Sequence, residues 1–195
     1  MALTESDIRN AAASIGVPPA AVKAVVEVES RGNGFLLDGR PRILFEGHVF
    51  WKQLKQRRID PVPLSKTYPT IVYPSWDRSK YRPSVEEWGR LNLAIHINRE
   101  AALCSASWGL FQIMGFNHAL CGYKSVEEFV TAQSESEGNQ LTAFCVFIES
   151  QRLAKYLVRK DWAAFAAAYN GDGYALNRYD TKLASEYAKA VKAGF

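Results

Sequence analysis

The sequence is poor in the residues that bind metals and form disulfides. Its 195 residues include only three cysteines and three histidines, and these show neither a CxxC spacing nor an HExxH motif. We therefore expect no metal site. Cys104, Cys121 and Cys145 cannot all pair with one another, and because free cysteine is among the most buried residue types, we expect three buried thiols.

Long apolar runs and leader-like features are also missing. The longest apolar runs, residues 143–148 and 162–169, fall far short of the roughly 20 residues that a membrane-spanning helix needs. The N-terminal sequence Met-Ala-Leu-Thr-Glu-Ser-Asp lacks the basic and apolar regions of a secretory signal. We expect a chain that does not insert into membranes and that is made and retained in the cytoplasm.

The overall composition is typical of a globular protein. Hydrophobic residues make up 48% of the chain and charged residues 23%, with 13 glycines and 8 prolines, which excludes disorder, collagen and coiled coil. A chain of this length can bury roughly 70% of its unfolded surface around one core. We therefore predict a single domain over residues 1–195.

Most of the chain has the periodicity of helices, with apolar residues recurring at intervals of three and four behind recognised start signals. We predict helices at residues 4–15, 20–30, 47–58, 84–103, 107–115, 125–133, 137–158, 161–169 and 176–192. Residues 35–45 instead predict two short strands about the turn Asp38-Gly39, the only convincing β element. The predicted fold class is mostly α (α+β), a helical domain with a small β-hairpin.

The region before the helix at 84–103 is rich in proline. Five prolines in residues 59–84 predict a long surface loop with little regular structure. Ser84 and Glu87, in Ser84-Val-Glu-Glu, have the spacing of a capping box, which predicts the start of the next helix.

Charge is unevenly distributed along the chain. Residues 52–82 carry eight Lys or Arg against two Asp, interleaved with tyrosine and tryptophan, whereas residues 125–150 carry five Glu and no basic residue. The basic stretch suits an anionic polysaccharide, and the same composition binds single-stranded nucleic acid or forms a merely solvated loop. Because no nucleic-acid module is recognisable, we do not expect nucleic acid as the partner.

The second predicted helix places a carboxyl on its apolar face. Three valines and Glu29 fall at positions i, i+3, i+4 and i+7, whereas Glu27 projects to the opposite side. Burial disfavours the charged form of Glu29, so its pKa should rise from the usual value of about 4.3, as a general acid requires. The alternative is a helix-terminal glutamate paired with Arg31 or Arg42.

Two further segments combine polar groups with glycine. Residues 106–115 place one amide, Gln112, in an apolar run, and residues 168–174 gather polar and aromatic groups around two glycines. Each segment has a purely structural alternative. The first could hold a buried amide satisfied by the backbone, and the second a helix C-cap at Gly171.

Taken in order, these segments resemble a known superfamily. Val28-Glu29-Ser30, Ser107-Trp-Gly-Leu-Phe-Gln-Ile113 and Ala168-Tyr-Asn-Gly171 are similar to motifs of goose-type lysozymes and lytic transglycosylases. With the addition of Leu44-Phe-Glu-Gly-His-Val-Phe50, the chain resembles the N-acetylmuramidase domain of phage endolysins from about residue 10 to about residue 190. The resemblance implies a lysozyme-like fold.

The resemblance also implies an enzyme that acts on bacterial peptidoglycan and cleaves the β-1,4 bond between N-acetylmuramic acid and N-acetylglucosamine. Carried over by position, Glu29 is the catalytic acid, and Gln112 contacts sugar in the cleft. Tyr169 and Asn170 orient the glutamate or the substrate. Ser30 and Trp108, which belong to the same motifs, are further candidates for substrate binding.

Glu46 is the candidate for a second catalytic carboxylate. In glycosidases this group activates water or acts as the nucleophile, and its distance from the acid decides which. Glu46 follows a predicted strand that folds back towards the end of the Glu29 helix. The alternative is that Glu46 holds His48 or an arginine in place.

The same resemblance implies how such a protein works in its setting. It implies an enzyme without metal or organic cofactor that leaves the host cytoplasm with the help of a holin. The sequence departs from many endolysins, because it leaves no room for a separate wall-binding module. We therefore expect a monomer that acts on Gram-negative cell walls, whose peptidoglycan layer is thin. The alternatives are a lytic transglycosylase, which forms 1,6-anhydro products, and a non-catalytic wall-binding or virion protein of the same fold. The C-terminal helix either closes the core or disturbs an outer membrane.

Overall fold

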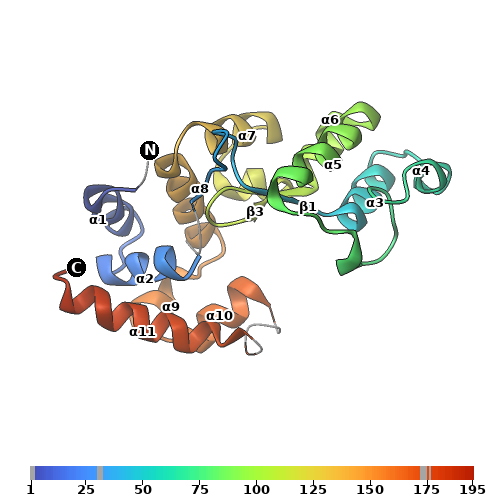
Figure 1. Ribbon diagram of the computed structural model, residues 1–195. Helices are drawn as coiled ribbons and strands as arrows, with labels where there is room; N and C mark the ends of the chain where they lie inside the picture. The colour runs from blue at the N-terminus through green and yellow to red at the C-terminus, as the bar shows by residue number, and fades with distance from the viewer. Residues whose placement is uncertain (1–2, 30–32, 172–174, 176) are drawn as a thin grey trace. The chain divides into compact units, whose positions relative to one another are not determined.

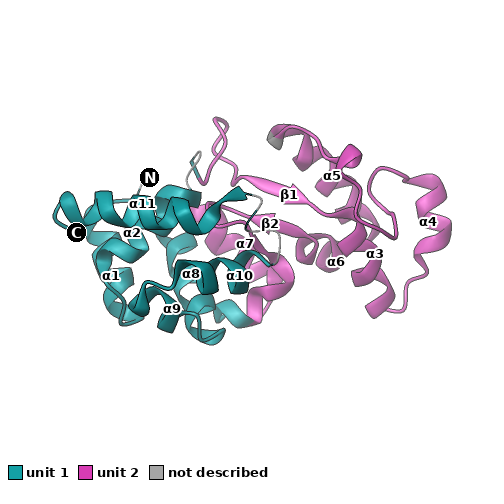
Figure 2. Ribbon diagram, turned by 90° about the horizontal axis from the view of Figure 1, so that it is seen from below, with its two compact units in different colours: residues 1–33, 120–122, 136–195 teal, residues 34–119, 123–135 magenta. Residues whose placement is uncertain are grey.

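The computed structural model describes residues 3–29, 33–171, 175 and 177–195, which are mainly helical (Figure 1). The chain divides into two compact units (Figure 2). Unit 1 comprises residues 1–33, 120–122 and 136–195, and unit 2 comprises residues 34–119 and 123–135. The 3-10 helix η2 (Gly115–Cys121) spans the boundary in sequence.

Unit 1 is helical. Its α-helices are α1 (Glu5–Ser14), α2 (Pro19–Glu29), α8 (Glu137–Ser150), α9 (Ala154–Arg159), α10 (Trp162–Asn170) and α11 (Tyr179–Lys192). The start of α1 is as predicted, because Thr4 caps it in a full capping box with Asp7. Pro19 occupies the first position of α2, where the missing N–H costs no hydrogen bond.

Helix α11 lies alongside α2 (Figure 1), and its apolar face closes the core of unit 1. Leu183 is fully buried and Ala190 is nearly so, whereas Val191 stays 49% exposed. Tyr187 packs against Trp162 of α10, with ring centroids 5.2 Å apart. The interpretation of this helix as a core element is thus confirmed for these buried positions.

Unit 2 combines helices with one small sheet. Its helices are α3 (Gly47–Gln56), α4 (Pro61–Thr67), the 3-10 helix η1 (Arg78–Lys80), α5 (Ser84–Ile97), α6 (Arg99–Cys104) and α7 (Val126–Glu135). Its antiparallel strands are β1 (Ile43–Phe45), β2 (Ala106–Trp108) and β3 (Ile113–Met114), in the order β1-β2-β3.

The sheet corrects two sequence predictions. The Asp-Gly turn forms, with Gly39 at φ +81° and a bridge between Phe35 and Pro41, but the strand that follows pairs with β2 rather than closing a hairpin over 35–45. The predicted helix at 107–115 is wrong. Gly109 and Gln112 adopt positive φ angles of 69° and 49°, which turn the chain between β2 and β3.

The proline-rich stretch contains more structure than predicted. Asp60 caps α4, and Pro61 occupies its first turn, where proline is well tolerated. Ile71 and Val72 are fully buried and anchor the following segment to the core. The stretch is therefore not a plain surface loop.

Other predictions hold with changed boundaries. The predicted helix at 84–103 divides at Asn98, whose side chain caps α6, and the one at 137–158 divides into α8 and α9. The three cysteines are free and buried, as expected. Burial raises the pKa of both Cys121 and Cys145 to about 12, which keeps these thiols protonated.

No single helix in the described ranges is long and apolar enough to cross a membrane. Helices α1 and α2 reach the required length and composition only as a pair, and they are bent by 117° relative to one another.

A buried ion pair stabilises unit 2. Glu87 is 1% exposed and Arg90 is 6% exposed, and Nη1 of Arg90 lies 2.6 Å from Oε2 of Glu87. The predicted capping box is wrong, because the N-cap of α5 is Pro83 and the Glu87 carboxylate instead accepts the backbone N–H groups of Phe45 and Arg82. The sequence could not show this, because the partner strand lies about 40 residues away in the chain.

Arg90 completes the network. It donates to the carbonyl oxygens of Phe45 and Thr70 and to the hydroxyl of Tyr73. The pair therefore ties the end of β1 to the segment before η1. Removing one member of such a buried, fully hydrogen-bonded pair lowers the stability of the fold strongly, because the remaining charge stays buried without a partner.

We predict that Arg90→Met lowers the free energy of unfolding by about 3–5 kcal/mol, because it leaves Glu87 buried and unpaired. Lys189→Met is the matched control, since it breaks the i,i+3 pair with Glu186 on the surface of α11 and should cost less than about 1 kcal/mol. Urea unfolding followed by circular dichroism measures both. Equal losses in the two variants would contradict the prediction.

Candidate active site

The carboxyl group of Glu29 lies at the end of α2 in unit 1. Val22, Val25 and Val26 of the same helix are buried, whereas Glu27 is exposed, as the predicted stripe requires. The hydroxyl group of Tyr179, the first residue of α11, donates a hydrogen bond to Oε1 of Glu29. In the described part of the chain Glu29 forms no ion pair, and Arg31 lies outside that part.

Burial raises the pKa of Glu29, as predicted from its position on the apolar face. The hydrogen bond from Tyr179 acts in the opposite direction, because it stabilises the ionised carboxylate, but it does not cancel the effect of burial. The pKa of Tyr179 is itself raised far above its usual value by burial and by the nearby Glu29 carboxylate. Tyr179 therefore remains a protonated donor.

The Ala-Tyr-Asn segment at the end of α10 lies close to this carboxyl. The side chain of Asn170 hydrogen-bonds to the hydroxyl group of Tyr179. The Tyr169 ring stacks on Phe165 with centroids 5.6 Å apart, and burial and the Glu29 charge raise the pKa of its hydroxyl. The structure thus brings both residues to the Glu29 group, with Asn170 acting on Glu29 through Tyr179.

The second carboxyl, Glu46, lies in unit 2 between β1 and α3. It is the N-cap residue of α3, yet its side chain makes no capping hydrogen bond. Instead, Oε2 accepts a hydrogen bond from the hydroxyl of Tyr81 at 2.5 Å and lies 3.3 Å from Nδ1 of His48. The Tyr81 hydroxyl in turn is hydrogen-bonded by the exposed Trp76.

The backbone on both sides of Glu46 is fixed. The Glu46 N–H donates to the carbonyl of Ser105, and the Gly47 N–H donates to the hydroxyl of Tyr73. A Cβ at Gly47 would lie 2.3 Å from a ring carbon of Tyr73, so only glycine allows this approach. Burial lowers the pKa of His48, with the Glu46 charge opposing it, so His48 is neutral near pH 7.

Two other candidates have mainly structural contacts. The Gln112 amide donates to the carbonyls of Gly109 and Arg42, and its oxygen accepts from Ser107. This is the buried-amide alternative, and it leaves the carbonyl oxygen one free lone pair for a ligand. Trp108 is fully buried and donates its indole N–H to the carbonyl of Leu103. It therefore offers no surface to a sugar, in contrast to the prediction that it binds substrate.

Two tyrosines that hydrogen-bond to the carboxyls were not predicted, and one candidate lies outside the described residues. Ser30 lies outside the described residues. Tyr179 was not predicted, because no local pattern links it to a residue 150 positions earlier. Tyr81 belongs to the basic aromatic stretch, and that composition was its only signal.

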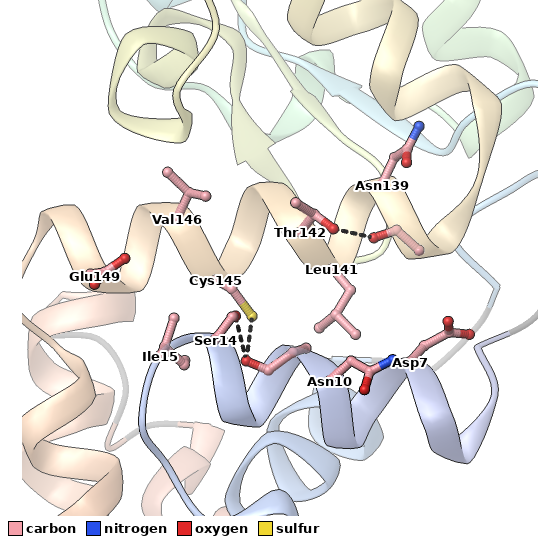
Figure 3. A pocket seen from close by; sticks show the side chains of 12 residues that line it. Asp7, Asn10, Ser14, Ile15, Asn139, Leu141, Thr142, Cys145, Val146 and Glu149 are labelled. Carbon is pink, nitrogen blue, oxygen red and sulfur yellow. Dashed lines mark hydrogen bonds between the residues drawn. The ribbon is translucent and has the colours of Figure 1, made fainter.

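A cavity of about 490 Å³ lies between α1 and α8 in unit 1, and neither Glu29 nor Glu46 lines it (Figure 3). Asn10, Leu141 and Cys145 are among its lining residues, whereas Glu29 is not. Its polar groups are partly used internally, since Thr142 donates to the carbonyl of Gly138. Within the described ranges, no group of three or more His, Cys, Asp or Glu side chains could hold a metal ion.

Comparison with known proteins identifies the family. A family model described as N-acetylmuramidase matches residues 18–191. The chain belongs to the N-acetylmuramidase family. The crystal structure of the Burkholderia AP3 phage endolysin is similar to this muramidase with a TM-score of 0.91 and 41% sequence identity, over 97% of this chain and 72% of that chain. No curated protein is similar enough to match. The likeness confirms the expected mostly helical, lysozyme-like fold.

We predict that Tyr179→Phe raises the pKa of Glu29 further, because it removes the hydrogen bond that stabilises the ionised carboxylate. If the protonated form is the active one, the alkaline limb of the pH-rate profile should move up by about one pH unit. The measurement is the lysis rate of bacterial cell walls from pH 4 to pH 9, and the control is Tyr187→Phe on the same helix. A limb that stays in place or moves down would contradict this role for Tyr179.

Proposed function

We propose that this muramidase is an endolysin that hydrolyses the β-1,4 bond between N-acetylmuramic acid and N-acetylglucosamine, with Glu29 as general acid. Membership of the N-acetylmuramidase family and the likeness to a phage endolysin support the degradation of peptidoglycan. The observation that carries the choice of residue is the desolvated carboxyl of Glu29, hydrogen-bonded by Tyr179. A carboxyl with a raised pKa holds a transferable proton nearer to neutral pH than an ordinary glutamate does.

In the proposed reaction the Glu29 carboxyl donates its proton to the glycosidic oxygen. The bond from that oxygen to C1 of N-acetylmuramic acid breaks, and C1 takes on oxocarbenium character. Glu29 is left as a carboxylate. Tyr179, which stays protonated, stabilises the new charge through its hydrogen bond and so supports the transfer.

Glu46 is the group that we propose to activate water. A glutamate that served only to begin α3 would cap the helix, whereas this side chain turns to Tyr81 and His48. Its carboxylate can accept a proton from a water molecule, whose oxygen then bonds to C1 and gives a reducing sugar. Without such a group the C6 hydroxyl of the substrate would attack C1 and give a 1,6-anhydro product.

The proposal extends to the setting of the enzyme. We propose a monomer that is released from the host cytoplasm with the help of a holin and then acts on the cell wall. The family resemblance supports this route. A non-catalytic wall-binding protein is the outcome to be expected if the purified chain binds peptidoglycan without degrading it.

We predict that Glu29→Gln lowers the rate of wall hydrolysis by about a thousandfold, because glutamine has no transferable proton. The fold should not lose stability at pH 7. The folded-state pKa of Glu29 is raised, so its contribution to stability is complete below the unfolded pKa of about 4.3 and is lost as pH rises through the folded-state value. Glutamine avoids that loss.

The measurement is clearing of chloroform-treated bacterial cells, with thermal unfolding as the check on folding. Glu27→Gln is the matched control, because Glu27 lies on the exposed side of the same helix and is paired with Lys23. It should clear cells at the wild-type rate. Clearing by Glu29→Gln at that same rate would remove Glu29 from the mechanism.

We predict reducing N-acetylmuramic acid ends in the products, because a water molecule beside the Glu46 carboxylate reaches C1 first. Mass spectrometry of digested peptidoglycan distinguishes them from anhydro ends, which are lighter by one water. Glu46→Gln should lower the rate by about a hundredfold or more, with the exposed Glu86→Gln as control. Anhydro products, or a fully active Glu46→Gln, would contradict the role given to Glu46.

A further inference from the structure

Strand β1 of unit 2, with the residue on either side of it, has one buried and one partly exposed face. The β1 and β2 pairing extends beyond the strands, because Gly109 donates to the carbonyl of Arg42 and Glu46 donates to the carbonyl of Ser105. Since side chains alternate along a strand, Arg42, Leu44 and Glu46 share a face. All three are partly exposed, whereas Ile43 and Phe45 on the other face are buried.

The backbone of Arg42 is held firmly in place on this face. Its N–H donates to the carbonyl of Gly34 at 2.9 Å, and its carbonyl accepts from the Gly109 N–H at 2.8 Å and from the Gln112 side chain at 3.4 Å. The side-chain amide of Gln112 is fixed by Ser107 and Gly109 as well. The position of the Arg42 Cα and Cβ atoms is therefore fixed by the sheet and by the turn at residues 109–112.

The guanidinium group of Arg42 has no protein partner in the described residues. Its Nε is buried and makes no hydrogen bond, and no ion pair includes it. Three other arginines of unit 2 are paired: Arg40 with Asp38, Arg57 with Glu100 and Arg90 with Glu87. A half-buried guanidinium without a counter-ion is costly, and an external carboxylate that meets its outer Nη1 and Nη2 atoms would relieve that cost, since Nε itself is closed to solvent.

We propose that Arg42 binds a carboxylate of the peptide stem of peptidoglycan and so favours peptide-bearing glycan over bare glycan. This inference rests on the proposed function. Arg42 lies four residues from Glu46 on the same strand face, or roughly 13 Å along an extended chain, so a stem bound there is separate from the sugar at Glu46. A guanidinium fork fits a carboxylate with two parallel hydrogen bonds.

The test compares two substrates: intact peptidoglycan, and glycan strands from which an amidase has removed the peptide stems. With intact peptidoglycan, Arg42→Gln should raise KM about tenfold and change kcat less than twofold, since the contact is equal in the ground and transition states. With stripped glycan, the wild type and Arg42→Gln should have the same KM. Arg42→Lys, which keeps the charge but not the fork, should fall between them.

Arg40→Gln is the matched control. It removes the same charge two residues away from Arg42, and Arg40 is already paired with Asp38. It should change KM less than twofold on either substrate. Thermal unfolding should show no loss of stability for Arg42→Gln, since no internal partner of Arg42 is removed. If Arg42→Gln does not fold, the comparison of Arg42→Lys with the wild type takes its place.

The proposal is overturned if Arg42→Gln leaves KM unchanged on intact peptidoglycan, or raises it equally on both substrates. A wild-type protein that degrades neither substrate contradicts the proposed function instead. In that event, cosedimentation with intact and stripped peptidoglycan still decides the inference. Weaker binding of Arg42→Gln to the intact material alone supports it, and equal binding overturns it.

Discussion

The proposed chemistry of unit 1 depends on a carboxyl group that is largely removed from water. Glu29 ends a helix whose buried residues are all alanines and valines, so its charged form lacks the solvation that a surface glutamate has. Helix α11 packs against this helix, and its first residue, Tyr179, donates a hydroxyl group to the Glu29 carboxyl. The arrangement is a compromise, because complete burial would leave the carboxylate unsolvated after proton transfer, whereas full exposure would return its pKa to the ordinary value.

The two carboxyls are supported in similar ways but have different surroundings. Each accepts a hydrogen bond from a tyrosine, and each tyrosine is contacted by a side-chain N–H group, from Asn170 in one unit and Trp76 in the other. Glu29 is set among apolar side chains, whereas Glu46 has the imidazole of His48 beside it. Glycosidases divide the roles of acid and base between two carboxyls by such differences in environment. The buried Glu87–Arg90 pair then fixes the strand end from which Glu46 projects.

The sequence predicted what depends on local periodicity and failed where distant residues decide. The burial of Glu29 followed from three valines on its own helix, and the start of α1 at Thr4 followed from the polar residues that open it. The strands at 106–108 and 113–114 were mistaken for helix, because short buried strands have no period that distinguishes them from a buried helix. Tyr179 lies 150 residues from its partner, and no pattern in one sequence shows such a contact.

The central claim is that Glu29 stays protonated to a higher pH than an ordinary glutamate. Carbon-13 NMR of protein labelled at the glutamate side-chain carboxyl tests it most directly, with the Glu29 signal assigned by its absence from Glu29→Gln. The account predicts a titration midpoint clearly above the usual value of about 4.3. A midpoint at or below that value would contradict the account, because the carboxyl would then be ionised before it meets its substrate.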